Sequence, residues 1–307
     1  MTNHACAACD ASDLQRLYDR TDDYITGDRF EIWQCQHCQA ARTLPVPADL
    51  GRYYPTLYRR YRPLIAAILA WLYRRRARHW ARLFAAPGSA FEMGCGNGLM
   101  LDTLRRWGWQ VIGSERTEEA AQIARDQFGL TVLGGGIETL DPNASFDLIL
   151  LNQVLEHLED PSATVAILAA RLKPGGRLII NVPNFASWQA RFGGRCWFHL
   201  DPPRHLHHFS SPALTALAGR HRLEIERISY VSPEHDPYGW VQSALNRLDR
   251  RSNRLTRLLM QLDPPDAANL LHLALGGLIG GFALPLSIAS WLAGRGALIE
   301  VVCARKL

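Results

Sequence analysis

The chain has 307 residues, of which 48% are hydrophobic, and it carries a formal net charge of +5. A chain of this length and apolar content can bury a large core, and it shows no internal repeat and no low-complexity tract, which excludes a disordered or repetitive protein. Only Lys173 and Lys306 of the 34 basic residues are lysine, so the positive charge is almost entirely arginine.

Two Cys-x-x-Cys pairs lie near the N-terminus, separated by residues 10–34. Each tight turn presents two thiolates together, and two such pairs complete the tetrahedral donor set of a structural zinc. The pattern predicts a zinc ribbon over residues 1–50, with the ligands Cys6, Cys9, Cys35 and Cys38. Two disulfides are the alternative, but they need an oxidising compartment, and the N-terminus has no basic region followed by an apolar stretch. Because the protein would supply all four ligands, this zinc is expected to be structural and not catalytic.

Residues 51–86 form a segment that is both basic and apolar. No acid and nine arginines lie between Asp49 and Glu92, and arginine clusters flank the apolar run from Leu64 to Tyr73. This pattern is typical of a helix at an anionic membrane surface, and it equally fits a helix that packs on a sheet with a solvated basic rim. A zinc ribbon beside arginine clusters is also an RNA-binding combination, so nucleic acid is a third possible partner.

An apolar strand ending at Glu92 and Met93 runs into the loop Gly94-Cys95-Gly96-Asn97-Gly98, and a helix is predicted from Leu99 to Trp107. Strand, glycine loop and helix in this order indicate a nucleotide-cofactor site. The dinucleotide fingerprint needs its third glycine where this chain has Leu99, which disfavours nicotinamide and flavin. The spacing acid-x-Gly-x-Gly-x-Gly resembles motif I of the class I S-adenosylmethionine-dependent methyltransferases.

This resemblance implies S-adenosyl-L-methionine as the cofactor. The three glycines would leave room where Cβ atoms would collide with it. Glu115, which follows a predicted strand from Trp109 to Ser114, would hold the ribose, and Glu92 would lie near the methionine ammonium; a solvated place beside a helix N-cap is the alternative for Glu115. Ile137 is expected to pack on the adenine. The candidate cofactor residues are Glu92, Gly94, Gly96, Gly98, Glu115, Ile137 and Asn152.

Further strands are predicted at 145–151, 178–182, 223–231 and 296–305, in alternation with helices. Alternation predicts an α/β fold with a doubly wound sheet that binds ligands at the carboxyl ends of its strands. The resemblance implies a seven-stranded, Rossmann-like methyltransferase sheet whose seventh strand runs antiparallel beside the sixth. The core would occupy 87–231 and 296–307, with the basic helical segment 51–86 before it and an apolar helical insertion, 232–295, before the last strand.

Within these enzymes the chain resembles the branch of the ubiquinone-pathway O-methyltransferases and of sugar and cell-envelope methyltransferases. The stretches Val154 to Pro161 and Pro203 to Pro212 carry this likeness. Gln153 stands where the quinone enzymes carry an acid, which weakens the case for a shared divalent-metal site. The fourth-strand signature of amino-methylating enzymes is absent, which disfavours methylation of a nucleobase or a glutamine amide.

Histidines in these two stretches are the candidate general bases, because histidine titrates near neutrality and a base assists attack by a hydroxyl. His157 and His205 are the candidate catalytic residues, with His207 and His208 behind them. A structural role is the alternative for both: His157 would cap the helix after the fourth strand, and His205 would fix the loop before the next helix.

The insertion contains an uncharged run, Ala267 to Gly294, that is long enough to cross a bilayer. A single crossing would leave the last strand on the wrong side of the membrane. The glycine pairs 276–277 and 280–281 together with Pro285 therefore predict two short helices, either as a shallow hairpin in one leaflet or as a cap on the substrate cleft. A soluble apolar cap or a dimer interface is the alternative.

These features together predict a cytoplasmic S-adenosylmethionine-dependent methyltransferase that contacts the inner face of an anionic membrane. The expected acceptor is a small-molecule or lipid-linked hydroxyl of a sugar, glycan or isoprenoid intermediate, and a quinone intermediate is the first alternative. The others are a zinc-ribbon binding protein with a non-catalytic cofactor fold and an RNA or protein methyltransferase, although nucleic acid is disfavoured as a partner. The sequence leaves the oligomeric state open.

Overall fold

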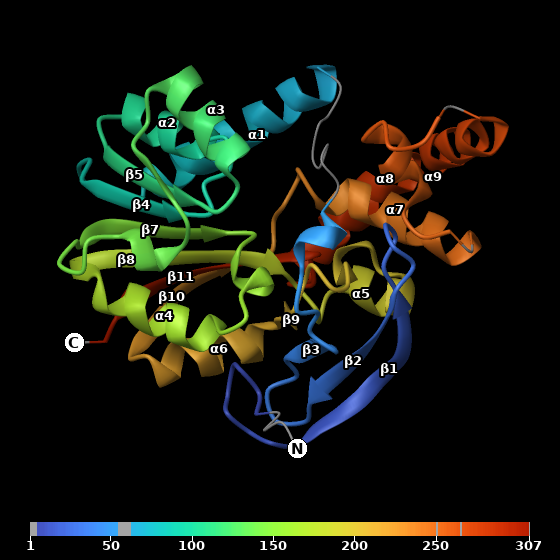
Figure 1. Cartoon of the computed structure of the whole chain (residues 1–307), viewed down its shortest axis with the longest axis horizontal. Helices are drawn as coiled ribbons and strands as arrows, with labels where there is room; N and C mark the ends of the chain where they lie inside the picture. The colour runs from blue at the N-terminus through green and yellow to red at the C-terminus, as the bar shows by residue number, and fades with distance from the viewer. Residues whose placement is uncertain (1–4, 55–62, 250, 265, 307) are drawn as a thin grey trace.

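The computed structural model describes residues 5–54, 63–249, 251–264 and 266–306, which form a seven-stranded and a four-stranded sheet (Figure 1). The larger sheet has the strand order β10-β11-β8-β7-β4-β5-β6. Its strands are β4 (Ser89–Met93), β5 (Gln110–Glu115), β6 (Val132–Gly134), β7 (Phe146–Asn152), β8 (Leu172–Pro183), β10 (Leu223–Ser229) and β11 (Leu298–Arg305). β11 is antiparallel to both neighbours, whereas the other pairs are parallel. This confirms the predicted seven-stranded sheet and its antiparallel seventh strand.

Helices cover both faces of this sheet. Figure 1 shows α1 (Pro63–Ala81), α2 (Leu99–Arg106) and α3 (Glu118–Phe128) on one face, and α4 (Pro161–Ala170) and α6 (Ser211–Arg220) on the other. Successive side chains of a strand point to opposite faces. Along β7, Leu148 and Leu150 accordingly pack in the α1–α2 layer, while Ile149 and Leu151 pack in the α4–α6 layer. The uninterrupted apolar run of β7 is therefore required by the doubly wound fold.

The basic segment is helical, and the two halves of α1 have different surroundings. Trp80, in the second half, is fully buried on the sheet, and its Nε1 donates to Glu300 Oε2 at 3.0 Å. The first half exposes Leu64, Ile68 and Trp71. Packing on the sheet thus holds for the C-terminal half of α1, and the N-terminal half presents apolar side chains to solvent.

The second sheet joins the N-terminal residues to the core. It contains β1 (Leu14–Asp22), β2 (Arg29–Cys35), β3 (Ala41–Leu44) and β9 (His207–His208), in that order. The edge strand β9 comes from the segment before α6, and it pairs with β3 through Ala41–His208 and Arg42–His207. We call residues 5–54 the N-terminal module; its sheet is complete only with two residues of the core.

The insertion consists of α7 (Asp236–Leu248), α8 (Arg254–Leu259) and α9 (Ala267–Leu292). The predicted break of residues 267–294 into two short helices is wrong, because α9 is one helix of 26 residues with Pro285 inside it. One of the four glycines serves packing: a Cβ at Gly276 would lie 3.0 Å from Leu255 Cδ2 and 3.4 Å from Val241 Cγ1, whereas a Cβ at Gly277, Gly280 or Gly281 would meet nothing within 4 Å. Packing of this kind outweighs the modest helix penalty of glycine, about 1 kcal/mol. Within the described residues, α9 is the one helix long and apolar enough to cross a membrane, with a mean hydropathy of 1.7 in its most apolar window.

The remaining connections are short. They include α5 (Trp188–Gly193) and the 3-10 turns η1 (Gly51–Tyr53), η2 (Ile137–Thr139), η3 (Leu155–His157), η4 (Gly194–Cys196) and η5 (Phe198–Leu200).

Candidate active site

The glycine loop follows β4 at the carboxyl edge of the sheet. Gly94, Gly96 and Gly98 all have positive φ, at 69°, 54° and 77°, which L side chains rarely adopt. A Cβ at Gly94 would lie 2.5 Å from Val154 Cγ2, and one at Gly98 would lie 2.5 Å from Leu130 Cδ1, whereas one at Gly96 would meet nothing within 4 Å. A Cβ at Gly94 or Gly98 would thus meet protein side chains, whereas Gly96 faces open space, and contact of the three glycines with the cofactor stays a prediction.

Two carboxylates flank this loop. Glu115, at the end of β5, accepts from the amides of Gly96 and Thr117, both at 2.9 Å, so it lies directly against the loop. Glu92 is 3% exposed, and its Oε2 has no hydrogen-bond partner among the described residues. Burial, aided by the charge of Glu115, raises the pKa of Glu92 to about 8. A buried carboxyl of this kind, just before a loop whose central glycine faces open space, fits a cofactor that brings an ammonium group.

The raised pKa of Glu92 predicts how stability depends on pH. The folded protein retains this proton up to about pH 8, whereas the unfolded chain loses it near its ordinary value of 4.5, so the free energy of unfolding falls as pH rises between these values, by at most about 1.4 kcal/mol per pH unit. Glu92→Gln should remove this loss. Urea unfolding at pH 5 and pH 8, without cofactor, is expected to show a larger gain in the free energy of unfolding of the variant over the wild type at pH 8 than at pH 5. An equal difference at both pH values would contradict the assignment.

Ile137 and Asn152 lie on either side of the loop along the same edge. The amide of Gly135 donates to the Glu115 carbonyl at 2.9 Å, which brings η2 and its half-buried Ile137 alongside Glu115. Asn152, at the end of β7, accepts from Asn181 Nδ2 at 2.8 Å. The edge therefore gathers Glu92, the glycine loop, Glu115 and Ile137, while the side-chain oxygen of Asn152 is bonded to the neighbouring strand.

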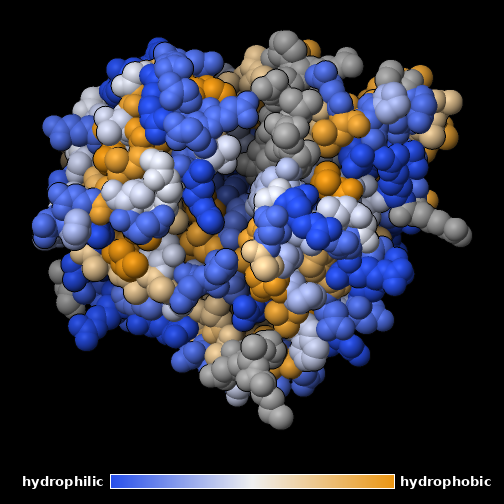
Figure 2. All heavy atoms as spheres, in the orientation of Figure 1, coloured by the Kyte–Doolittle hydropathy of each residue, from blue (hydrophilic) through white to orange (hydrophobic). Residues whose placement is uncertain are grey.

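His157 and His205 form a pair of rings. Their centroids are 4.7 Å apart in an edge arrangement with an interplanar angle of 70°. The His157 amide donates to the carbonyl of Val154, whose side chain abuts Gly94, so the turn that carries His157 joins the glycine loop. Figure 2 shows one face of the molecule, hollowed near its centre between the core, at left, and the N-terminal module and insertion, at right.

The hydrogen bonds of the two rings define which nitrogen carries the proton. His157 Nδ1 donates to the Arg204 carbonyl and His205 Nδ1 donates to the His199 carbonyl, each at 2.8 Å. A carbonyl oxygen only accepts, so each neutral ring is protonated on Nδ1 and retains its lone pair on Nε2. Nε2 is thus the basic atom of both residues.

His207 and His208 have structural surroundings. His208 Nε2 bonds Thr43 Oγ1 at 3.0 Å, and His207 Nε2 donates to the Glu159 carbonyl at 3.3 Å. Burial lowers the pKa of both residues, that of His207 to about 4. Both rings are therefore neutral members of the sheet β1-β2-β3-β9.

Several site residues gave no signal in the sequence. Glu156 is 1% exposed, and with His157 and His205 it offers ligand atoms within 4.8 Å of one another, close enough to share a divalent cation. Tyr54 Oη lies 3.4 Å from His157 Nδ1. Glu156 belongs to the stretch Val154 to Pro161, which carries the family likeness. Its buried side chain lies close to His205, however, and a contact between residues so far apart in the sequence has no local pattern.

A buried ion pair lies beside the histidines. Arg204 pairs with Asp23 at 2.8 Å and with Asp201 at 2.6 Å, and the side chains of Arg204 and Asp23 are fully buried. Although burial opposes it, the charge of Arg204 lowers the pKa of Asp201 to about 2. These charges join the loop that carries His205 to the N-terminal module.

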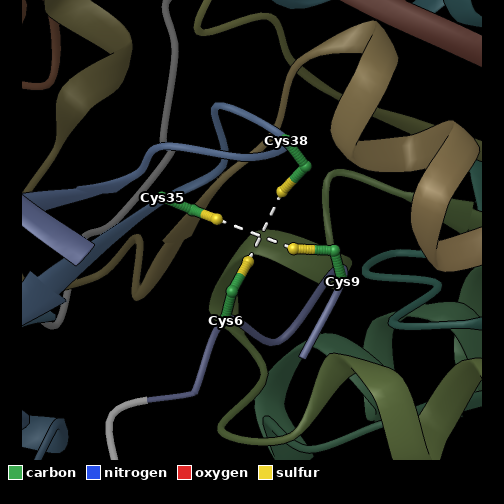
Figure 3. A group of neighbouring side chains, drawn as sticks. All are labelled: Cys6, Cys9, Cys35 and Cys38. Carbon is green, nitrogen blue, oxygen red and sulfur yellow. Dashed lines mark hydrogen bonds between the residues drawn. The ribbon is translucent and has the colours of Figure 1, made fainter. Parts of the chain in front are cut away.

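The four predicted zinc ligands are brought together. Figure 3 shows the sulfur atoms of Cys6, Cys9, Cys35 and Cys38 pointing to a common centre. The Sγ atoms of Cys6 and Cys38 are 3.5 Å apart, and those of Cys9 and Cys35 are 3.6 Å apart, close to the edge of about 3.8 Å that Zn–S bonds of about 2.3 Å give a tetrahedron. The convergence of the four sulfur atoms fits a metal centre, and the four cysteines are not joined by a disulfide in the structure.

Comparison with known proteins identifies similar sequences. A family model described as a methyltransferase domain matches residues 58–228. The ubiquinone biosynthesis O-methyltransferase of Xanthomonas oryzae is 30% identical over 162 residues, which cover 48% of this chain and 68% of that protein. The enzyme of the same name from Idiomarina loihiensis is 36% identical over 110 residues, covering 32% of this chain and 44% of that protein.

Solved structures with a similar arrangement include a possible histamine N-methyltransferase from Thermotoga maritima, with 18% identity and a TM-score of 0.47, covering 78% of this chain and 92% of that one. A cyclopropane synthase from Mycobacterium tuberculosis has 15% identity and a TM-score of 0.49, covering 78% and 84%.

Proposed function

We propose that this chain, which belongs to the class I S-adenosylmethionine-dependent methyltransferases, transfers the methyl group of that cofactor to a hydroxyl of a sugar, a lipid-linked glycan or an isoprenoid intermediate. The observation that carries the hydroxyl acceptor is the pair His157 and His205, whose tautomers leave Nε2 of each ring as a base beside the glycine loop. An acceptor hydroxyl needs such a base, because it must lose its proton as the new bond forms.

Each residue of the site has a defined task in this reaction. When bound, the cofactor supplies a methyl group on a sulfonium, which is already activated. Glu92 and Glu115 would hold the polar ends of the cofactor, with Ile137 against its adenine. One histidine Nε2 would accept the proton of the hydroxyl while its Nδ1 stays fixed on a carbonyl. Positioning and proton acceptance are then the protein's whole contribution to the rate.

We also propose that the N-terminal cysteines hold a structural zinc. The separation of the four sulfur atoms and their common direction support this assignment. With four protein ligands such a site has no open position for a substrate, so it stabilises the N-terminal module and leaves catalysis to the core.

Membrane contact is the third part of the proposal, and α9 supports it. The distribution of polar and apolar residues on this helix is the opposite of that on a surface helix of a water-soluble protein. Its buried residues are small or polar, and its exposed residues are apolar. The buried residues are Asn269, Gly276, Ala283, Ser287 and Ser290, and the exposed ones include Leu270, Leu271, Leu278, Phe282, Leu284, Ile288 and Leu292. Leu278 and Phe282 are each 72% exposed. Small residues at the contact and large apolar residues outside are typical of helices in lipid.

The ends of α9 support a position parallel to the membrane surface. Before α9, Arg257 donates to the Tyr24 carbonyl of the N-terminal module at 3.0 Å. At the other end, Trp291 donates to Asp236, which also accepts from the amide of Ala297 at 2.9 Å. The helix α8 that leads into α9 and the C-terminal end of α9 are thus fastened to the same body, which favours a position along the membrane surface over a crossing. With the exposed arginines of α1 beside Trp71, this favours the cytoplasmic face of an anionic membrane.

This proposal predicts that α9 determines binding to lipid vesicles. Leu278→Glu combined with Phe282→Glu should lower partitioning onto vesicles of mixed phosphatidylglycerol and phosphatidylcholine by at least about 10-fold, because each buried apolar side chain contributes roughly 2 kcal/mol. Leu17→Glu is the matched control, since Leu17 is an exposed apolar residue of β1. Co-sedimentation measures the partitioning. Unchanged binding by the double variant would overturn the role of α9. A wild-type protein that is dimeric, with a double variant that is monomeric, would instead show that the exposed face of α9 binds a second copy of this chain.

A quinone-pathway acceptor is the second candidate. It is favoured by the relatives named ubiquinone biosynthesis O-methyltransferase, at 30% and 36% identity. Such an acceptor also carries a hydroxyl and an isoprenoid chain, so the histidine pair and α9 suit it equally.

The test is to incubate the purified protein with methyl-labelled S-adenosylmethionine and extract from cells that lack the gene, and then to separate quinones, other lipids, polysaccharide, nucleic acid and protein. Label in lipid or polysaccharide, reduced by His205→Ala, supports the first proposal, and label in quinones supports the second. Label in nucleic acid or protein would refute both.

A further inference from the structure

The segment Arg204–Ser210, which carries His205, is held between two parts of the molecule. On the core side, the Leu206 amide donates to the Glu156 carbonyl at 2.8 Å, and His157 bonds the Arg204 carbonyl. All seven residues of the segment are buried. Its conformation therefore depends on what holds its other side.

The N-terminal module supplies that other side. The Arg204 guanidinium pairs with Asp23, donates to the Tyr53 carbonyl at 2.6 Å and lies over the Tyr24 ring, 4.4 Å from its centroid. At the far end of the segment, Ser210 Oγ donates to the Cys38 carbonyl at 3.2 Å. Between these two anchors β3 runs beside the segment, with Ala41 and Arg42 paired to His208 and His207, and one further residue of β3 bonds it through its side chain.

That residue is Thr43, which is fully buried. Its amide donates to the Leu206 carbonyl at 3.0 Å. Its hydroxyl donates to the His205 carbonyl at 2.6 Å and accepts from His208 Nε2 at 3.0 Å. One side chain of the module thus bonds His208 and the backbone carbonyl of His205, the candidate base.

We propose that Thr43 is a positioning residue for methyl transfer: through the carbonyl of His205 it fixes the imidazole of that residue, so the N-terminal module is one wall of the active site. The inference rests on the proposed function, because it takes His205 as a residue of the reaction. The Thr43 hydroxyl donates to one carbonyl and accepts from one imidazole, so these two bonds fix its orientation. A base must be held in place in this way to accept a proton efficiently.

Thr43→Val tests the proposal, because it preserves the shape of the side chain and the amide bond to Leu206 while removing both hydroxyl contacts. The rate is the initial transfer of label at saturating S-adenosylmethionine to the extract fraction that accepts it. We expect a fall on the order of 10-fold, an unchanged dissociation constant for the cofactor, and recovery of the rate in Thr43→Ser.

The matched control is Thr21→Val, because Thr21 is another buried threonine of the same module and its hydroxyl donates to the Phe30 carbonyl at 3.1 Å, away from His205. A fall of equal size in both variants would show a general loss of stability and overturn the proposal. Hydrogen–deuterium exchange gives a readout independent of activity: Thr43→Val should speed exchange of peptides covering 204–210, and Thr21→Val should not.

A double-mutant cycle separates this inference from the proposed function. If Thr43 acts through His205, Thr43→Val has no further effect on the rate in a His205→Ala background. A slow His205→Ala with a fully active Thr43→Val would refute the role of Thr43 alone. An unaltered rate in His205→Ala would refute the role of His205, and the inference with it.

Discussion

Gly96→Arg is expected to abolish binding of S-adenosylmethionine, with a loss of at least about 100-fold, or roughly 2.7 kcal/mol. Gly96 has a φ of 54°, and a Cβ there would point into open space at the carboxyl edge of the sheet. An arginine at this position would occupy that space beside Glu115 and would also strain the loop, because left-handed backbone costs an L residue about 1–2 kcal/mol. Isothermal titration calorimetry measures the loss.

Gly175→Arg is the control for strain. Gly175 has a φ of 76°, and a Cβ at this position would also meet nothing within 4 Å. It lies in the N-terminal part of β8, away from the carboxyl edge. We expect a similar loss of stability in both variants and normal cofactor affinity in Gly175→Arg. Normal affinity in a folded Gly96→Arg protein would show that the loop does not hold the cofactor.

Cys35→Ser is expected to release the zinc and to unfold the N-terminal module. Cys35 is 1% exposed and provides one of the four convergent sulfur atoms. A structural zinc contributes about 10–16 kcal/mol of apparent binding free energy at pH 7, all of which depends on a complete ligand set. Metal analysis of the purified protein and thermal unfolding measure the two effects, and a chelator should reproduce them in the wild type.

Cys196→Ser is the matched control, since Cys196 is a half-buried cysteine outside the cluster. It should retain one zinc per chain and the wild-type transition. A wild-type protein that carries no metal, with a transition unaffected by Cys35→Ser, would refute the zinc assignment.

The residues that could be predicted from the sequence are those whose chemistry depends on neighbours in the chain. The glycine loop with Glu92, the strand ending at Glu115 and the Cys-x-x-Cys turns are such local patterns, and the structure brings each set together. The seven strands, with the seventh antiparallel beside the sixth, followed from the family resemblance and are confirmed.

The rest depends on contacts between distant segments. The pairing of Arg204 with Asp23, and of Thr43 with His205, joins residues that share no periodicity or spacing. The sequence also did not predict that α9 is continuous. Glycine and proline taken alone predict a break, whereas the close contact of Gly276 with Leu255 and Val241 favours a continuous helix. Local propensity is overruled wherever tertiary packing is the stronger term.

The place of β9 also determines when the N-terminal module finishes folding. Its cysteines and first three strands leave the ribosome early, but the strand that covers β3 is formed by residues 207–208. During synthesis at roughly 5–20 residues per second, the edge of β3 therefore waits through the translation of about half of the chain before its partner emerges. The N-terminal module is thus synthesised first, but its sheet is completed only after β9 has been made. During that interval the edge of β3 is unpaired, and a chaperone or early zinc binding would protect it from pairing with other chains.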